Sequence, residues 1–187
     1  QVDAYAHGRS SDEWLELVST PATRLGMNQR MRLIALFFDV NRERIIDPDA
    51  RYAELYRLRN EPPGSWSEQE LRDLQCKFTL AWTCRGDLQA GLVDPALLAK
   101  SRDYTEDDRT ALVQAQQELV RDFLPRLGRL AASGQVELAT SPFAHPIIPL
   151  LIDTDVARSV QDTPLPHPAF CHPEDALQQL QLGKRYV

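Results

Sequence analysis

The chain has 187 residues, of which 43% are hydrophobic and 26% charged, and its formal net charge is −6. This composition is typical of a folded globular protein and excludes wholesale disorder, and the absence of any run of 18 apolar residues excludes a membrane-spanning helix. Because an acidic surface repels phosphate backbones, we expect neither a nucleic acid nor a membrane as partner.

The cysteines and the first residue bear on where the protein resides. Three cysteines, Cys76, Cys84 and Cys171, cannot all pair with one another. Their odd number and low density favour free thiols in a reducing compartment over a disulfide framework, so we expect a cytoplasmic protein. The chain begins at Gln1 without a Met and without the basic and apolar segments of an export signal, which indicates either processing or a piece cut from a longer protein.

Three helices are predicted before residue 64. The stretch Ser10-Ser11-Asp12-Glu13 can form a capping box, in which a serine hydroxyl bonds a free backbone N–H and the glutamate reaches back. A second helix is predicted over residues 28–40. Its apolar residues are expected to be nearly all buried: Met31, Ile34, Leu36, Phe37 and Phe38. Asp47 before Pro48 forms a good cap and first position for a third helix, which the sequence Pro62-Pro63-Gly64 ends.

Three further helices are predicted between residues 67 and 132. Ser67 and Glu70 form a capping box, after which apolar residues recur at spacings of three and four. These residues are Leu71, Leu74, Phe78, Ala81 and Trp82. Asp94 before Pro95 predicts a short helical turn. Thr105 is expected to cap the longest helix, which runs to about Ala132.

The pattern changes at Gly134, which is well placed to end the long helix in a left-handed conformation. Residues 135–140 are typical of a strand, and Ser141-Pro142 ends it. His172-Pro173 then begins a last helix that reaches towards Lys184. The sequence therefore predicts an α/β chain that is predominantly helical, with helices around one visible strand for which no pairing partner is evident.

Candidate chemistry lies between Gly134 and Leu151. A strand followed by a polar stop and a proline-stiffened loop places side chains at the carboxyl end of the strand, where parallel α/β proteins bind ligands. Pro146 biases His145 towards an extended backbone, and an imidazole on a stiff loop loses little entropy when it binds a substrate hydroxyl. The alternative is that His145 bonds backbone groups of its own loop. Glu137 needs a partner if it is ionised within a strand, so an ion pair to a helix is as good an interpretation as a ligand contact.

The stretch 134–151, Gly-Gln-Val-Glu-Leu-Ala-Thr-Ser-Pro-Phe-Ala-His-Pro-Ile-Ile-Pro-Leu-Leu, resembles the second conserved stretch of glycoside hydrolase family 57. That family contains α-amylases, amylopullulanases, branching enzymes and 4-α-glucanotransferases. Three other places are similar to the family in the same order along the chain. They are Asp73-Leu74-Gln75 with Leu80-Ala81-Trp82, then Tyr104-Thr105-Glu106-Asp107-Asp108, and finally Pro173-Glu174-Asp175-Ala176 with Gln178 and Gln179. The resemblance covers most of the chain from Trp14 to Tyr186.

The resemblance implies a retaining mechanism on α-glucans within a seven-stranded (β/α) barrel. Such a mechanism needs two carboxyl groups about 5–5.5 Å apart, a glutamate nucleophile and an aspartate that acts as general acid and base. The family's nucleophile lies in a Trp-x-x-Glu-like stretch after the helix that begins at Pro173, and its aspartate follows later, so we expect neither in this chain. The resemblance thus implies an internal fragment of the catalytic domain that is inactive alone. Residues 1–132 would be a helical insertion, and residues 133–187 a barrel strand, a substrate loop and the following helix.

The same resemblance implies a set of contacts with substrate. It assigns substrate binding or support of the site to His145, Glu137, Ser141 and Pro142, and it assigns no catalytic residue in this chain. The expected partners are an α-glucan and the remainder of the parent catalytic domain, without a cofactor. Trp82 is a possible platform for a glucose ring, although an aromatic residue at its helical spacing is more often part of the core.

Two other interpretations of the sequence concern metals and a different function class. His145, His167, Cys171 and His172 could be drawn together as zinc ligands, but the spacing of a metal motif is absent and we expect no metal site. The alternative to a carbohydrate-active enzyme is a non-catalytic helical module for protein interaction.

Overall fold

The computed structural model describes residues 12–83, 91–159 and 168–185, together with Ala4 and Gly86. The chain divides into two compact units, Gln1–Arg126 and Leu127–Val187, which we call the N-terminal unit and the C-terminal unit. Every regular element within the described ranges is helical, and no strand is present there. No helix among the described residues is both long and apolar enough to cross a membrane.

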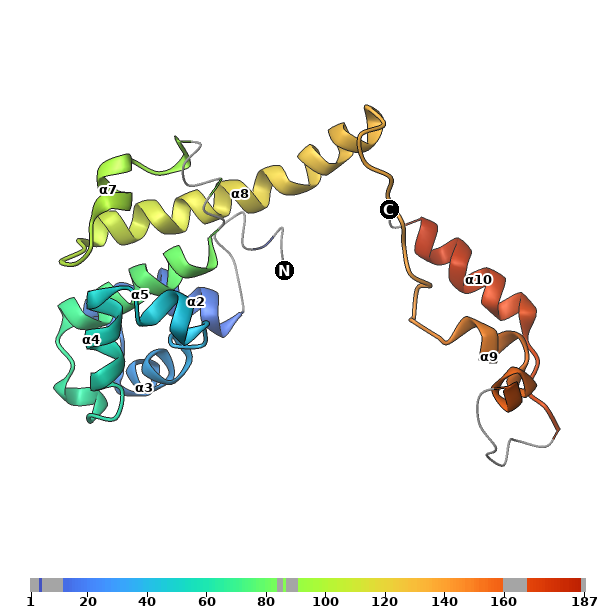
Figure 1. The fold of residues 1–187 in the computed structure, drawn as a ribbon, viewed down its shortest axis with the longest axis horizontal. Coiled ribbons are helices and arrows are strands. Elements are labelled where there is room, and N and C mark those ends of the chain that lie inside the picture. Colours follow the sequence, from blue (N-terminus) through green and yellow to red (C-terminus); the bar gives the residue numbers. More distant parts are fainter. Residues whose placement is uncertain (1–3, 5–11, 84–85, 87–90, 160–167, 186–187) are drawn as a thin grey trace. The chain divides into compact units, whose positions relative to one another are not determined.

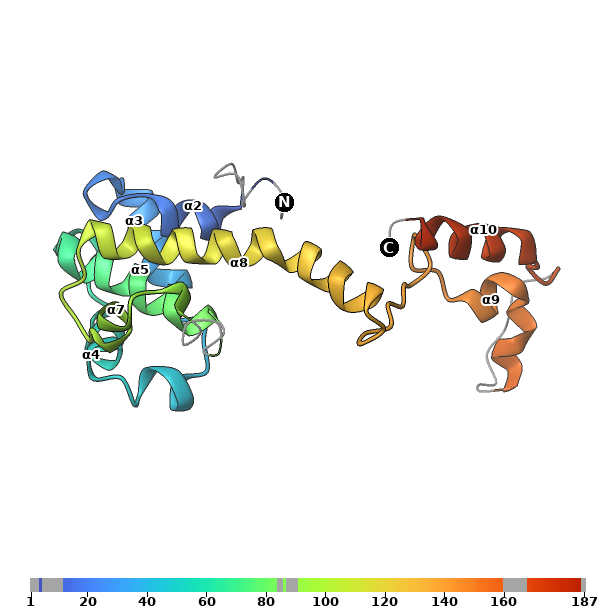
Figure 2. The same cartoon turned by 90° about the horizontal axis from the view of Figure 1, so that it is seen from above.

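The N-terminal unit is built around helix α5 (Glu68–Trp82). This helix packs against α2 (Glu13–Ser19), α3 (Met27–Leu36) and α4 (Ala50–Leu58), and Figures 1 and 2 show it in the middle of them. The other elements are η1 (Ala22–Arg24), the π-helical turn η2 (Arg42–Ile46), η3 (Pro63–Ser65), α7 (Pro95–Ala99) and α8 (Glu106–Ala132), whose last turns belong to the C-terminal unit.

Helix α5 is buried on two sides, each in its own apolar cluster. On one side Leu74 and Phe78 join buried residues of α2, α3 and α4. Phe37 and Trp14 stack on Phe78 there, with ring centroids 4.2 Å and 5.3 Å away. On the other side Cys76 joins buried residues of α7 and α8. Because full burial of a Leu or Phe side chain stabilises a fold by about 1.5–3 kcal/mol, α5 holds the whole unit together.

The predicted capping residues of α5, α7 and α8 are confirmed. Ser67 and Glu70 form the capping box of α5: the Ser67 amide donates to Glu70 Oε2 at 2.7 Å, and the Glu70 amide donates to Ser67 Oγ at 3.2 Å. Asp94 accepts from the backbone of α7, and Thr105 Oγ1 accepts from the Asp108 amide at 3.1 Å. Local side-chain chemistry therefore fixes where these three helices begin.

The first two helices differ from the prediction in their details. Asp12 caps α2, with its Oδ1 accepting from the amides of Trp14 and Leu15, whereas Ser10 and Ser11 lie outside the described residues. Helix α3 ends at Leu36 rather than near residue 40. Met31 is 52% exposed rather than buried. At 3.6 residues per turn, Met31 lies about 110° around the helix from the centre of the stripe formed by the buried residues of α3. The apolar pattern of the sequence did not show that Met31 lies outside this stripe.

The predicted start of the third helix was two residues early. Asp49 caps α4, because its Oδ1 accepts from the Tyr52 amide at 2.8 Å. The Asp47 amide instead donates to the Arg42 carbonyl at 2.9 Å and closes the π-helical turn η2. Asp47-Pro48 therefore lies between two helical elements and does not begin either of them.

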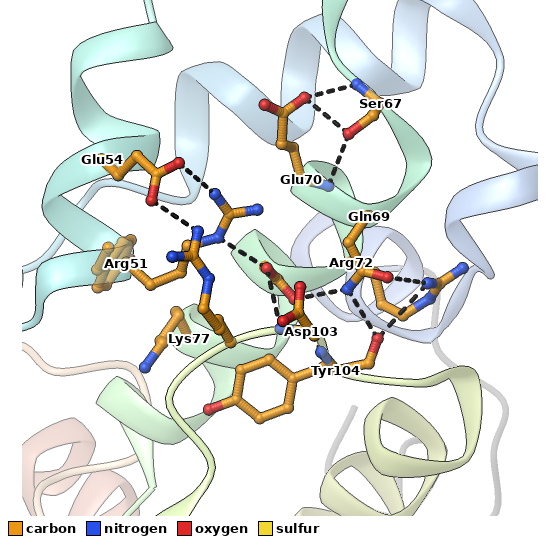
Figure 3. A network of polar contacts seen from close by, with 12 residues as sticks. Arg51, Glu54, Ser67, Gln69, Glu70, Arg72, Lys77, Asp103 and Tyr104 are labelled. Atoms are coloured by element: carbon orange, nitrogen blue, oxygen red, sulfur yellow. Dashed lines mark hydrogen bonds and ion pairs between the residues drawn. The ribbon is translucent and has the colours of Figure 1, made fainter.

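A buried carboxylate joins α4, α5 and the segment before α8 (Figure 3). Asp73 on α5 is fully buried, and its Oδ2 accepts from Arg51 Nε at 2.8 Å. Its Oδ1 accepts from Gln69 Nε2 at 2.8 Å and from the Tyr104 amide at 2.9 Å. Arg51 also donates to Glu54 Oε1 at 2.7 Å. A charged carboxylate is stable in the interior only with such partners, so the network fixes three segments against one another.

Gln75, two residues after Asp73 on α5, has a similar structural role. Gln75 is fully buried, and its Nε2 donates to the carbonyls of Leu17 and Thr20 at 2.6 Å and 2.8 Å. The stretch Asp73-Leu74-Gln75, one of the places that resembles the glycoside hydrolase family, therefore holds helices together.

The C-terminal unit contains α9 (Ile148–Ile152), the 3-10 helix η5 (Thr154–Ser159) and α10 (Pro173–Lys184). Helices α9 and α10 lie side by side in Figures 1 and 2. Backbone hydrogen bonds from His172 to Leu151 and from Thr154 to Phe170, at 2.8 Å and 3.0 Å, tie the two helices' ends. Among the described residues of this unit, only Ala176 and Gly183 are buried.

The predicted α/β fold, a fragment of a seven-stranded (β/α) barrel, is wrong: the described residues form helices and no sheet. Residues 136–140 form no strand. Their alternation of apolar and polar residues predicts one apolar face, but a strand also needs a neighbouring strand to satisfy its backbone, and no other described segment provides one. Val136 and Leu138, on the expected inner face, are 37% and 38% exposed.

Candidate functional site

The candidate site begins where helix α8 ends. Gly134 has φ +73°, and its amide donates to the Ala131 carbonyl at 3.0 Å. The Gln135 amide donates to the Leu130 carbonyl, also at 3.0 Å. These two bonds form a Schellman motif, which needs a left-handed residue at this position. The prediction that Gly134 ends the long helix in a left-handed conformation is confirmed.

The turn Pro142–His145 carries two of the four predicted substrate residues, and Ser141 directly precedes it. The His145 amide donates to the Pro142 carbonyl at 3.0 Å and closes the turn. His145 has φ +54°, which corrects the prediction that Pro146 holds it in an extended backbone. A left-handed residue other than glycine costs on the order of 1–3 kcal/mol and persists only where its surroundings impose it. The turn is therefore held by contacts from elsewhere in the unit.

Helix α10 provides those contacts. The Phe143 amide donates to the Gln179 carbonyl at 3.1 Å, and the Ala144 amide donates to Gln179 Oε1 at 2.8 Å. Gly183 lies one turn further along α10, where a Cβ atom would be only 2.5 Å from the Ser141 carbonyl oxygen. One glutamine and one glycine of α10 thus fix both sides of the turn.

The predicted site residues are all accessible to a ligand. Glu137, Ser141 and His145 are exposed, and Pro142 is half-buried. The structure brings Ser141, Pro142 and His145 together on one turn, while Glu137 lies four residues before Ser141 on the extended segment. Neither the His145 ring nor Glu137 forms a hydrogen bond or an ion pair with another described residue.

A comparison with models of known protein families places this turn in context. The model described as glycosyl hydrolase family 57 matches residues 29–186. The chain belongs to this family. No curated protein and no solved structure matches the chain. The family match includes most of the N-terminal unit, the Pro142–His145 turn and the whole of α10, and it gives the chain a role related to glycoside hydrolysis.

Sequence reasoning missed the importance of Gly183 in this family 57 chain. Gln179 was among the residues that resemble the family, but its bonds to the turn were not foreseen. Gly183 did leave a signal, because a glycine inside a helix costs about 1 kcal/mol relative to alanine and usually has a packing reason. The close approach of the Ser141 carbonyl is that reason.

The described residues considered as metal ligands, His145, Cys171 and His172, form no group that could hold a metal ion. Among the described residues no group of three His, Cys, Asp or Glu side chains could hold a metal ion, and His167 lies outside them. His172 Nδ1 is instead 3.2 Å from Glu174 Oε1. The backbone amide of Glu174 and the His172 ring lower the pKa of the Glu174 carboxyl, which is typical of an acidic residue in the first turn of a helix.

The helical spacing of Trp82 favours a position in the core, but its side chain is exposed. Trp82 lies at the last residue of α5 and is 63% exposed, whereas Trp66 is buried and Trp14 is half-buried against the core. The interpretation of Trp82 as a core residue is therefore wrong, although its exposure alone does not make it a binding site.

Proposed function

We propose that this family 57 chain supplies substrate contacts in an α-glucan-active retaining glycoside hydrolase or glucanotransferase. The observation that supports this most is the Pro142–His145 turn, where an exposed imidazole stands on a left-handed residue that α10 holds in place. Backbone strain of this kind is concentrated at functional sites, and the family match includes the turn.

Each predicted site residue has a role that suits its chemistry. The His145 ring offers one nitrogen as donor and one as acceptor to sugar hydroxyls. The Ser141 hydroxyl and the Glu137 carboxylate provide further bonds to hydroxyl groups along the approach to the turn. Pro142 contributes its rigid backbone, because its carbonyl accepts the bond that closes the turn.

The two carboxyl groups of a retaining mechanism must lie about 5–5.5 Å apart across the scissile bond. The stretch 134–151 contains only one carboxylate, Glu137. We therefore propose that the catalytic glutamate and aspartate belong to the remainder of the catalytic domain, outside residues 1–187, and that the chain alone does not hydrolyse glucan.

The exposed apolar surface of the C-terminal unit supports such a partner polypeptide. Its large exposed side chains include Phe143, Ile147, Ile152, Phe170 and Leu177. A contiguous apolar patch on a surface usually marks a contact with other protein, and these residues are candidates for one. We also keep the cytoplasmic location as a proposal, supported by the free thiols of Cys76 and Cys171.

The test uses the complete protein, meaning residues 1–187 with the polypeptide that flanks them. His145→Ala is expected to lower kcat/KM on amylose about 10- to 100-fold, the cost of a lost hydrogen bond to substrate, while the melting temperature stays the same. His172→Ala is the matched control, because it removes the same side chain from the same unit outside the turn and is expected to leave kcat/KM unchanged. Unchanged turnover with a lowered melting temperature for His145→Ala would show that the residue is structural.

The second candidate is a non-catalytic helical module for protein interaction. The helical architecture of the described residues and the exposed apolar side chains of the C-terminal unit favour it. The same experiment separates the two: a complete protein that neither hydrolyses nor transfers α-glucan supports the module.

A further inference from the structure

A hollow of about 340 Å³ lies beside the C-terminal end of α5, well away in sequence from the Pro142–His145 turn. Its apolar lining comes from two tryptophans and their neighbours: Trp14, Leu15, Val18, Phe78 and Trp82. Its polar lining consists of Asp39, Thr79 and Gln116. This volume is near the lower end of the range for small-molecule sites, and mainly apolar walls with a few polar groups are typical of such sites.

The aromatic wall of the hollow is rigid, and its outermost ring is available. Phe37, Phe78 and Trp14 stack on one another in the core. Trp82 follows at the end of this row, with its ring centroid 6.2 Å from that of Phe78 and tilted by 56°. Because Trp82 is 63% exposed, the row ends in an indole that the core supports but does not cover.

Polar groups border this indole. Gln116 Nε2 donates to Thr83 Oγ1 at 3.1 Å and to the Thr79 carbonyl at 3.4 Å, which positions the amide at the edge of the hollow. Asp39, which also lines the hollow, is exposed and lies just after α3 ends. Asp39 also lines a second hollow of about 650 Å³. The aromatic residues Phe38 and Tyr56 line this second hollow. Aromatic surface therefore continues past the carboxylate.

We propose that this hollow is a contact site for α-glucan in addition to the Pro142–His145 turn. A pyranose ring has an apolar C–H face and a polar edge of hydroxyls, which fit an indole face bordered by a carboxylate and an amide. Trp82 stacks on the ring, Asp39 accepts from its hydroxyls, and longer chains extend across Asp39 into the second hollow. The choice of glucan as the ligand rests on the proposed function, while the place of the site rests on the geometry of the N-terminal unit.

The test is a titration of the 187-residue chain with maltoheptaose, followed by ¹⁹F NMR of 5-fluorotryptophan. The three tryptophan signals are assigned by substitution, and buried Trp66 serves as an internal reference. We expect the Trp82 signal to shift saturably and the Trp66 signal to stay in place. A wild-type chain whose Trp82 signal does not respond overturns the proposal.

Variants then show which side chains contribute to the affinity for maltoheptaose. Truncation of a central aromatic anchor typically weakens binding by about tenfold or more, and we expect this for Trp82→Ala, measured by calorimetry with maltoheptaose. Trp82→Phe keeps a smaller ring and is expected to bind with intermediate affinity. Phe123→Ala removes another ring of the same unit that is 60% exposed, and it is expected to bind like wild type. Affinity that is unchanged in Trp82→Ala overturns the proposal.

His145→Ala separates this proposal from the proposed function when maltoheptaose binding is measured in the complete protein, because the C-terminal unit buries few of its described residues by itself. Binding that is weakened by His145→Ala but not by Trp82→Ala contradicts the second site and agrees with the turn as the substrate contact. Binding that is weakened by Trp82→Ala alone supports the second site, and the activity of the complete protein then decides the role of the turn by itself.

Discussion

The two units of this chain differ in how much of their apolar surface they bury. In the N-terminal unit, α5 lies between two apolar clusters, and even the carboxylate of Asp73 is fully enclosed with its partners. In the C-terminal unit, only Ala176 and Gly183 are buried among the described residues. Because apolar burial is the dominant favourable contribution to folding, we expect the N-terminal unit to fold independently and the C-terminal unit to need further protein.

This difference also separates the two proposed binding surfaces. The Pro142–His145 turn is bound by Gln179 of α10 and packs closely on Gly183 of the same helix. The Trp82 hollow has a wall that the main core supports from behind. A site of the first kind can be formed or lost with small changes in its surroundings, and a site of the second kind is already formed.

The largest loss of unfolding free energy is expected from Asp73→Ala. The substitution removes the buried partner of Arg51 Nε and leaves Arg51 only its pair with Glu54, and loss of a buried partner typically costs about 3–5 kcal/mol of unfolding free energy. Urea denaturation followed by far-UV circular dichroism measures it, because both units contain helices. Asp155→Ala, which breaks the exposed pair with Arg158 in the C-terminal unit, is the control and should cost less than about 1 kcal/mol. Similar losses for both variants would contradict the contrast between the units.

A smaller loss of unfolding free energy is expected from Gly183→Ala. The new Cβ would lie 2.5 Å from the Ser141 carbonyl oxygen, and a backbone atom cannot move aside as a flexible side chain can. We expect a cost of about 1–3 kcal/mol, which outweighs the gain of about 1 kcal/mol from alanine's better helix propensity. Hydrogen exchange of the Phe143 and Ala144 amides should become faster.

Gly128→Ala is the matched control for that helix substitution. Gly128 lies inside α8, and no atom is within 4 Å of the position that its Cβ would occupy. Alanine there should stabilise the helix by about 0.5–1 kcal/mol. Unchanged exchange at Phe143 and Ala144 in Gly183→Ala would show that α10 does not hold the turn.

The smallest expected effect is a change in how the melting temperature depends on pH. Burial raises the pKa of Glu106, but hydrogen bonds from Arg109 and Arg72 outweigh it and hold the pKa below the ordinary value of 4.5. A carboxyl whose pKa is lower in the folded state stabilises the fold above its unfolded pKa, and this stabilisation is lost as the pH falls through the folded value. Melting temperatures between pH 7 and pH 3 should therefore fall less steeply for Glu106→Gln than for wild type. Glu118→Gln, at an exposed position of α8, should keep the wild-type slope.

Most helix starts could be predicted from the sequence because caps are local. Ser67 with Glu70 and Thr105 with Asp108 satisfy backbone amides within three residues of themselves. Gly134 was predictable for the same reason, since its left-handed backbone is a property of the helix end. The third helix was misplaced because Asp47 and Asp49 are both competent caps, and only the π-helical turn η2 decides between them.

What depends on distant segments could not be predicted in this way. The alternation in residues 135–140 indicates an apolar face, but whether a strand forms depends on a neighbouring strand that the sequence pattern does not reveal. His145 has a left-handed backbone because α10, more than 30 residues later, binds its turn through Gln179. Helical spacing favoured the core for Trp82, but it lies in the last turn of α5, where the packing partners end.

The measurement that tests the central claim most directly is NMR of ¹⁵N-labelled imidazoles in the complete protein during titration with a maltooligosaccharide. If the Pro142–His145 turn contacts substrate, the ring nitrogens of His145 shift saturably at the concentrations that support turnover, while those of His172 stay unchanged. A His145 ring that does not respond while the protein converts α-glucan would contradict the account.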